Sequence, residues 1–257
     1  MTQIDARSVV HESAKLADGV VVEPFAIIGA NVTIGKNTVV RSMALVDRNT
    51  EIGEDCEICH GAAVGGDPQD LKYGGEETFL RIGDRTVIRE FATINRGTGD
   101  GGTTVVGNEG LICAYAHIAH DCVVGDNVVL VNAVNVAGHV AIEDYAFIGG
   151  MTGVQQFVRI GAHCYIGGGC RVIKDVPPYF KVGGSPARPI EVNMIGLMRR
   201  GFAEEALSAL RLSYRLLYLS DLNTTQALVR IREEVPETAE VTRLISFIES
   251  SSRGIIK

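Results

Sequence analysis

Ile28-Gly-Ala-Asn-Val-Thr33 is followed directly by Ile34-Gly-Lys-Asn-Thr-Val39, and this six-residue unit recurs through most of the 257-residue chain. Each unit begins with isoleucine, valine or leucine, and its fifth position usually holds a small or compact residue. Neither the period of a helix nor that of an ordinary strand gives this spacing. The first positions, none of them polar, are Ile4, Val10, Leu16, Val22, Ile28, Ile34, Val40, Val46, Ile52, Ile58, Val64, Ile82, Ile88, Ile94, Val106, Ile112, Ile118, Val124, Leu130, Val136, Ile142, Ile148, Val154, Ile160, Ile166 and Val172.

The hexads predict a mainly β protein, a parallel β-helix of hexapeptide repeats. Three hexads close one triangular coil of 18 residues, and each side of the coil is a very short strand. Coils stack at about 4.8 Å through backbone hydrogen bonds and bury the aliphatic column along the axis. Glycine or a polar residue often occupies the second position, where we expect a tight corner to need freedom in φ. Known hexapeptide solenoids are left-handed, against the usual crossover rule, and we expect that hand here.

The pattern changes at two gaps and at its end. The gaps, near residues 67–81 and 97–105, are polar and glycine-rich, and we expect loops that carry function there. The repeat stops at Asp175-Val-Pro-Pro-Tyr179, because paired prolines cannot join a strand ladder. We therefore predict a β-helix over residues 1–188 and a C-terminal helical domain over 189–257. Helices are expected over residues 203–219, 224–234 and 238–251.

Bulk properties narrow the class of protein. The net charge of −7 argues against a general nucleic-acid binder, which would present a basic face. No apolar run is long enough to span a membrane, and Met1–Val10 lacks the apolar core of a signal peptide. We expect a cytoplasmic protein that binds no nucleic acid and has no transmembrane segment.

The cysteines are interpreted as structural. Four of the six occupy the small inward position of the hexad. Cys56-Glu-Ile-Cys59 has the spacing of a redox or zinc motif, but no second pair exists and Cys59 falls on a corner. Free thiols that fill space fit a protein of the cytoplasm. The four inward cysteines are Cys56, Cys122, Cys164 and Cys170.

His117-Ile-Ala-His120-Asp121 is the stretch with the most reactive side chains. Ile118 points inward, so His120 lies near a corner and can point out of the prism. Adding 18 residues moves one coil along the same edge, from His120 to Gly138 and then to Gln156. The period therefore predicts one outer edge that carries His117, His120, His139, Gln155 and Gln156, with Gly138 beside His120.

This edge favours catalysis, although two other interpretations stay open. A histidine beside an aspartate is suited to be an oriented general base, and a neighbouring glycine N–H can serve as an oxyanion donor. His-x-x-His with a third histidine one coil away could instead hold zinc, and the histidines could also be surface decoration. His11, His60 and His163 have no such companions, and we interpret them as structural.

Several motifs resemble, in order, those of the bacterial UDP-N-acetylglucosamine O-acyltransferases, which begin lipid A synthesis. The resemblance covers essentially the whole chain, both loops and the helical tail included. The motifs are Gln69-Asp-Leu-Lys-Tyr73, His117-Ile-Ala-His-Asp-Cys122, Ala137-Gly-His139, Ile148-Gly-Gly-Met-Thr152, Asp175-Val-Pro-Pro-Tyr179 and Gly196-Leu-Met-Arg-Arg-Gly-Phe202.

The resemblance implies a role for each matched residue. His120 is implied to be the general base that deprotonates the glucosamine 3-hydroxyl as it attacks an acyl thioester. Asp121 is implied to orient this histidine, and the Gly138 N–H to be the oxyanion donor. The implied substrate contacts are Asp70 and Lys72 on the first loop, His117, His139, Gln155 and Gln156 on the prism, and Asn193, Arg199 and Arg200 near the diphosphate and the donor.

The resemblance also implies partners. The acyl donor of the family is acyl carrier protein, which is strongly acidic, and the enzymes are homotrimers with active sites between prisms. Neither a cofactor nor a bound metal is expected. We predict that a basic cluster steers the carrier to the site. Its members are Arg159, Arg171, Lys174, Lys181, Arg188, Arg199 and Arg200.

Three departures from the family pattern bear on the substrate. Gln155 stands where well-known members usually carry histidine, Pro186 where some members carry a polar residue or histidine, and Ile195 where others carry glutamate. These departures leave the acyl chain and the sugar open. Gly168 matches a position where bulkier side chains shorten the acyl pocket, which favours a longer, 3-hydroxylated chain.

The alternative functions are an acyltransferase for another nucleotide sugar, including a 3-amino sugar that would give an amide, and a zinc hydratase related to carbonic anhydrase. A non-catalytic scaffold is a third.

Overall fold

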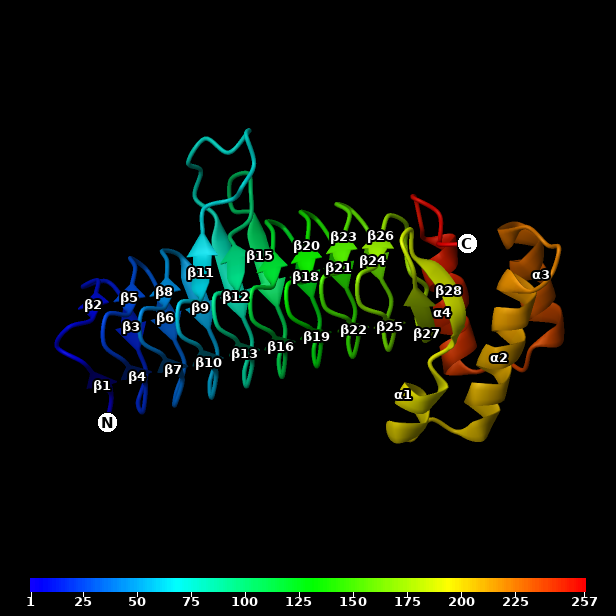
Figure 1. Ribbon diagram of the computed structural model, residues 1–257, viewed down its shortest axis with the longest axis horizontal. Helices are drawn as coiled ribbons and strands as arrows, with labels where there is room; N and C mark the ends of the chain where they lie inside the picture. The colour runs from blue at the N-terminus through cyan, green and yellow to red at the C-terminus, as the bar shows by residue number, and fades with distance from the viewer.

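The computed structural model describes residues 1–257 and is a long three-sided prism of short strands, with helices at its C-terminal end (Figure 1). Three sheets close the left-handed parallel β-helix that the hexads predict. Sheet A contains β1 (Gln3–Ile4), β4 (Val21–Val22), β7 (Val39–Val40), β10 (Glu57–Ile58), β13 (Val87–Ile88), β16 (Leu111–Ile112), β19 (Val129–Leu130), β22 (Phe147–Ile148), β25 (Tyr165–Ile166), β27 (Phe180–Gly183) and β28 (Arg188–Val192). Sheet B contains β2 (Val9–Val10), β5 (Ile27–Ile28), β8 (Leu45–Val46), β11 (Ala63–Gly66), β14 (Thr93–Asn95), β17 (His117–Ile118), β20 (Asn135–Val136), β23 (Gly153–Val154) and β26 (Arg171–Val172). Sheet C contains β3 (Lys15–Leu16), β6 (Thr33–Ile34), β9 (Thr50–Ile52), β12 (Phe79–Ile82), β15 (Thr103–Val106), β18 (Val123–Val124), β21 (Ala141–Ile142) and β24 (Arg159–Ile160).

Strand register confirms the 18-residue coil. Ile28 pairs with Val46 in sheet B, and Val136 pairs with Val154. The aliphatic first positions fill the axis of the prism, where 44 buried residues form one core. Burial decreases at the open N-terminal end, where Ile4 is 51% exposed because no earlier coil covers it.

The expected reason for glycine in the second position of the hexad is wrong. The left-handed backbone conformation falls on the fourth position, as at Asn31 and Asp55, which have φ of 56° and 55°, and Gly65, before the first loop, is the exception in the second position. Glycine in the second position is needed for space instead. A Cβ on Gly53 would lie 2.2 Å from the side-chain Oδ1 of Asp84, and one on Gly35 would lie 2.5 Å from the backbone of the next coil. Close stacking of coils therefore selects these glycines.

Both gaps in the repeat are loops, and they are shorter than predicted. The first, residues 67–78, stands out from the prism between β11 and β12, and the second, residues 96–102, follows β14 close by (Figure 1). Strands β12 and β15 each have four residues and pair with one another over Phe79–Ile82 and Thr103–Val106. The last residues assigned to each gap therefore belong to strands.

The prism continues beyond the predicted stop at the two prolines. Val176 bridges to Ile160, and after the prolines β27 adds to sheet A by pairing Tyr165 with Lys181. The prolines lie between these two ladder contacts, so neither has to donate to a ladder. Strand β28 then turns back antiparallel to β27 across residue 188. The division of the chain at that residue stays a prediction.

Four helices follow, and three of them were expected. They are α1 (Met194–Arg199), α2 (Glu204–Tyr218), α3 (Thr224–Glu234) and α4 (Ala239–Glu249). The Asn223 side chain forms a capping box with Gln226 at the start of α3, and Thr238 caps α4. The short helix α1 was missed, because six residues show no helical period. A second core of 18 buried residues joins the helices to the end of the prism, and none of the helices is long and apolar enough to cross a membrane.

All six cysteines are free, and the four inward ones are buried. Burial raises the pKa of Cys122 and of Cys164 to about 12, so both thiols stay protonated. Cys59 is buried as well, at 6% exposure, although it lies on a corner. These features agree with the interpretation of the cysteines as space-filling residues.

Candidate active site

A cleft of about 610 Å³ lies on the outer face of sheet B and at the corner where sheet B turns toward sheet C. We call this the B–C corner and define it as residues 119–122, 137–140 and 155–158. The cleft brings together five of the residues that the period placed on one edge, and three further polar residues join them. The five are His117, His120, Gly138, Gln155 and Gln156, and the three are Gln69, Asn135 and Arg171.

His120 and Asp121 form a hydrogen-bonded pair at this corner. Nδ1 of His120 lies 2.8 Å from Oδ2 of Asp121, and the two side chains are only 13% and 15% exposed. Thr98, from the second loop, donates to Asp121 twice, through its N–H at 2.9 Å and its hydroxyl at 2.6 Å. The N–H of Asp121 donates to the hydroxyl of Thr104 at 2.8 Å. The carboxylate is thus held by groups outside the histidine motif.

The charge state of Asp121 fixes the tautomer of His120. Burial alone would raise the pKa of Asp121, but hydrogen bonds from Thr98 and His120 outweigh burial and hold that pKa below its usual value. An ionised carboxylate can only accept, so Nδ1 of His120 must donate the hydrogen between them. Nε2 of His120 then carries the free lone pair, which is the arrangement of a general base.

Gly138 gives the imidazole its space. A Cβ at this position would lie 2.5 Å from Cε1 and 2.7 Å from Nε2 of His120, so any side chain would displace the ring. The N–H of Gly138 donates no hydrogen bond within the chain. A free backbone donor therefore lies beside the free lone pair, and such a pair of groups can act on a hydroxyl and on a carbonyl oxygen.

Two further histidines surround the pair. His139 stacks on Phe157 with ring centroids 4.6 Å apart and places Nε2 3.6 Å from Oδ2 of Asp121. His117 shares a hydrogen bond of 2.8 Å with the Thr93 hydroxyl. Burial and the nearby His120 lower the pKa of His117, so this ring is neutral at neutral pH.

One group of side chains could hold a metal ion. The ligand atoms of His120, Asp121 and His139 lie within 4.8 Å of one another. However, Nδ1 of His120 and the Thr98 hydroxyl already bond to Oδ2 of Asp121. These hydrogen bonds engage the aspartate with its donors, which favours an oriented base over a metal site.

The first loop brings only one of its residues to the cleft. Gln69 lines the cleft, whereas Asp70 and Lys72 do not. Oδ1 of Asp70 accepts from the N–H of Lys72 at 2.9 Å and so shapes the tip of the loop. The Lys72 side chain is exposed and has no ion-pair partner.

The residues predicted to contact the diphosphate line a second cleft, of about 800 Å³, against sheet A and α1. Asn193 caps α1, and its amide donates to the backbone carbonyl of His163 at 2.9 Å. The guanidinium of Arg200 lies 3.9 Å above the ring of Tyr145. Arg199 and Ile195 also line this cleft. The two clefts share no residue, and they open on different faces of the prism.

The remaining predicted positions are more scattered. Gly168 is exposed between β25 and β26, where a Cβ would lie 3.1 Å from the carbonyl oxygen of Gly150, and it does not line the cleft of His120. The basic residues do not form one patch. Arg159 lies in sheet C over the ring of Phe247 at 4.3 Å, whereas Lys181 lies in sheet A and pairs with Glu191.

Sequence reasoning did not assign Thr98, Gln69 or Asn135 to the site, and it placed Arg171 in the basic cluster but not in the cleft. Arg171 could have been found, because it lies one coil from Gly153 and two from Asn135 on the face of His117. Thr98 and Gln69 lie in loops that the period does not reach. Their part in the site becomes visible only in the folded chain.

Known proteins resemble this chain along its whole length. The family described as UDP N-acetylglucosamine O-acyltransferase, domain 2, matches residues 175–256, and the bacterial transferase hexapeptide repeat matches residues 13–48. An acyl-[acyl-carrier-protein]–UDP-N-acetylglucosamine O-acyltransferase from Burkholderia orbicola is 50% identical over 211 residues, which cover 80% of each chain.

Solved structures agree with these matches. A UDP-N-acetylglucosamine acyltransferase from Bacteroides fragilis has a TM-score of 0.97 at 40% identity, and the match covers 99% of this chain and 100% of that one. The enzyme of the same name from Francisella novicida has a TM-score of 0.95 at 40% identity, with 99% and 94% covered.

The hexapeptide repeats and the relatives named as acyltransferases define the class of protein, a hexapeptide-repeat acyltransferase. With half of the aligned residues identical and both the prism and the helical end matched, the family is also defined. The chain belongs to the UDP-N-acetylglucosamine O-acyltransferase family.

Proposed function

We propose that this chain transfers a fatty acyl group from acyl carrier protein to the 3-hydroxyl of UDP-N-acetylglucosamine, the first step of lipid A biosynthesis. Family membership supports the reaction class and both substrates. The observation that carries the proposal at the level of residues is the His120–Asp121 hydrogen bond beside Gly138.

The reaction follows from the free atoms of this site. Nε2 of His120 takes the proton of the sugar hydroxyl as its oxygen bonds to the thioester carbonyl carbon. The Gly138 N–H stabilises the negative charge on the carbonyl oxygen, and Asp121 stabilises the imidazolium. When the carbon–sulfur bond breaks, His120 returns the proton to the leaving thiolate, and the ester and the free carrier thiol remain. General base catalysis of this kind contributes about 10²- to 10⁴-fold.

We propose that substrate binding uses both clefts. His117, His139, Gln155 and Gln156 would contact the sugar and the acyl group near the base, and Asp70 and Lys72 would reach the sugar from the first loop. Asn193, Arg199 and Arg200 would bind the diphosphate, for which a planar guanidinium is well suited. Because the two clefts open on different faces of one prism, a single nucleotide sugar would need two chains to touch both.

We therefore propose a homotrimer with active sites between neighbouring prisms. Apolar side chains along the corner between sheets A and B support it, because such a row of exposed apolar residues is typical of a surface that another chain covers. Phe91 and Tyr115 stack there at 5.4 Å. The exposed members are Phe25, Met43, Phe91, Tyr115 and Met151.

The acyl donor is proposed to approach the cleft of His120 near Arg171 and Lys174. Both side chains are exposed, and Arg171 lines the cleft. The donor and the six free thiols support a cytoplasmic location. Gly168 leaves room for a long acyl chain, which we propose to be 3-hydroxylated.

A direct assay tests the function. Purified protein would be given acyl carrier proteins loaded with chains of different length, with and without a 3-hydroxyl, and either UDP-N-acetylglucosamine or its 3-amino analogue. We expect an ester with the hydroxyl sugar and a preference for one long chain. Transfer to the amino sugar alone would reject the proposed acceptor, and no transfer from any acyl carrier protein would reject the donor.

A further inference from the structure

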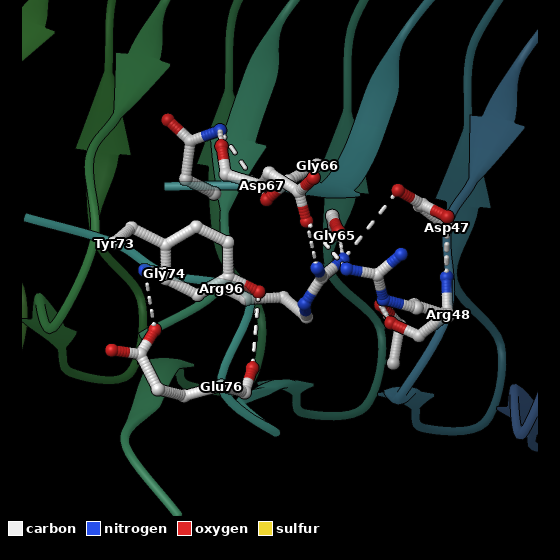
Figure 2. Close-up of polar contacts among 11 residues, drawn as sticks. Asp47, Arg48, Gly65, Gly66, Asp67, Tyr73, Gly74, Glu76 and Arg96 are labelled. Carbon is white, nitrogen blue, oxygen red and sulfur yellow. Dashed lines mark hydrogen bonds and ion pairs between the residues drawn. The ribbon is translucent and has the colours of Figure 1, made fainter. Parts of the chain in front are cut away.

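Arg96 is a fully buried arginine that the reaction described above does not use. It follows β14 directly, and its guanidinium lies beneath the start of the first loop (Figure 2). Nη1 donates to the carbonyl of Gly65 and lies 3.5 Å from a carboxylate oxygen of Asp47, and Nη2 pairs with Asp67. Nε has no partner, and the Tyr73 hydroxyl of the loop also approaches the guanidinium.

A buried arginine charge fixes the groups around it. A guanidinium out of water must keep its carboxylates, because an unpaired buried charge is strongly unfavourable. The planar fork also sets the direction from which the Gly65 carbonyl and the Asp67 carboxylate approach. Gly65 lies in the last part of β11 and Asp67 is the first residue of the loop, so the contacts of Arg96 with both constrain the angle at which the loop leaves β11.

The backbone reinforces the same junction. The N–H of Arg96 donates to the carbonyl of Gly66 at 3.0 Å, and the Asn95 amide donates to the carbonyl of Asp67 at 2.8 Å. At the far end of the loop, the N–H of Gly101 donates to the carbonyl of Glu77 at 2.9 Å. Nearer the tip, Tyr73 approaches Arg48 and Arg96, whereas Leu71 is fully exposed. The base of the loop therefore decides where its tip points.

Arg96 also adjoins the residue that holds the catalytic aspartate. Thr98, two residues further on, donates to both carboxylate oxygens of Asp121. One short segment, residues 95–98, thus holds the base of the first loop with Asn95 and Arg96 and orients the His120–Asp121 pair with Thr98.

We propose that Arg96 is a positioning residue for the nucleotide sugar. It sets the loop of Gln69, Asp70 and Lys72 at a fixed angle to His120, so that the sugar hydroxyl reaches Nε2 of this histidine. This role rests on the proposed function, because it assumes that the loop binds the acceptor.

Kinetics of Arg96→Lys test the proposal. Lysine keeps the charge but loses the fork, so we expect the KM for UDP-N-acetylglucosamine to rise about tenfold or more, since a small misplacement of a binding group has effects of this size. The KM for acyl carrier protein should stay unchanged. Asp67→Asn gives a second test should the first variant fold poorly, because its side chain is 55% exposed. It should raise the same KM.

Arg81→Lys is the matched control. Arg81 is an exposed arginine of β12 that pairs with Glu51 at 3.6 Å rather than with a residue of the loop, and its replacement should leave both KM values unchanged. Amide hydrogen exchange of residues 67–78 should be faster in Arg96→Lys and in Asp67→Asn than in the control. A merely structural role would lower the amount of active enzyme, and hence kcat, without changing either KM.

The results separate the two ideas. If both loop variants are active and have an unchanged KM for the sugar, the role of Arg96 is overturned, whereas the proposed function is not. A wild-type chain without acyl transfer would reject the proposed function before any variant is compared, and hydrogen exchange would still report whether Arg96 holds the loop.

Discussion

Two corners of the prism use the same hexad position in opposite ways. At the corner between sheets C and A, the third position holds carboxylates and amides that accept from the N–H groups of the preceding coil. Asp84 accepts from Glu54, Asn108 from Asp84, Asp126 from Asn108 and Asp144 from Asp126, over 2.7 to 2.9 Å. At the B–C corner the third position holds His120, Gly138 and Gln156, and this ladder is missing.

The difference shows how a structural repeat can be adapted to form the candidate active site. Glycines such as Gly107 make room for ladder side chains, since a Cβ there would lie 2.4 Å from Asp126. At the B–C corner the glycine is in the third position, as Gly138, and the space that it leaves is occupied by the ring of His120. Because this corner lacks the ladder of side-chain hydrogen bonds, the N–H of Gly138 and Nε2 of His120 are free. Acyl transfer requires a hydrogen-bond donor and a base of this kind.

The largest effect should come from His120→Ala. Removal of the general base is expected to lower kcat about 10²- to 10⁴-fold while the fold is unchanged, because the ring lies outside the aliphatic core of the prism. Steady-state kinetics with both substrates saturating would measure it. His11→Ala, at the N-terminal end of the prism, is the control and should have normal activity. A His120→Ala enzyme with near-normal kcat would rule out the base.

Gly138→Ala should come next. The new Cβ would overlap the His120 ring and displace Nε2, so we expect a loss in kcat of about 10²-fold. The test is a double-mutant comparison. In the His120→Ala background the same change should have much less effect, because no ring remains to be displaced. Equal losses in both backgrounds would show that Gly138 acts independently of His120.

Thr98→Val should reduce activity by a smaller factor, about tenfold, and change its pH dependence. Loss of the Thr98 hydroxyl removes a hydrogen bond that lowers the pKa of Asp121, so this pKa should rise. The acidic limb of the profile of kcat/KM against pH should therefore move to higher pH. Thr98→Ser keeps the hydroxyl and should retain the wild-type profile. An unshifted limb in the valine variant would contradict this account of Asp121.

Asp126→Ala should show the reverse pattern at the ladder corner. It leaves the N–H and the side-chain amide of Asn108 without their acceptor, which should cost about 1–2 kcal/mol of unfolding free energy. The value of kcat should remain that of the wild type. Denaturant unfolding followed beside the assay would measure both. A large loss of activity without loss of stability would mean that the ladder corner also serves the reaction.

The smallest effect concerns His163, which holds the fourth position of the ladder corner as His139 does at the B–C corner. Burial, followed by the charges of Arg200 and Arg243, lowers the pKa of His163 to about 4. The unfolded chain binds this proton at a higher pH, so stability contributed by the neutral ring should be lost as the pH falls from about 6.5 toward 4. His163→Phe keeps an aromatic ring between Tyr145 and Tyr179.

Unfolding midpoints at about pH 7.5 and about pH 5 would test this last prediction. The difference between the two midpoints should be smaller in His163→Phe than in the wild type. An equal difference would show that other groups account for the acid sensitivity.

Much of the fold was accessible from the sequence because its signals are local and periodic. The hexads define the prism, and capping residues such as Asn223 and Thr238 mark the helices. The edge that joins His120, Gly138 and Gln156 also followed from the period, since a fixed number of residues per coil converts spacing into position. The residues around that edge, Thr98 and Gln69, were not accessible, because the loops that carry them interrupt the period.

The sequence by itself therefore determined which side chains point inward and which share an outer edge. Only the tertiary structure decided what holds the His120–Asp121 pair and the loop. Thr98 and Asp121, 23 residues apart, and Arg96 and Asp67, 29 residues apart, meet across coils that loops separate. The tertiary structure also decided that glycines in the second position serve close packing of coils, and that the two predicted halves of the site open on different faces. Contacts between non-repeating segments depend on how the loops fold back, and a local pattern does not encode that.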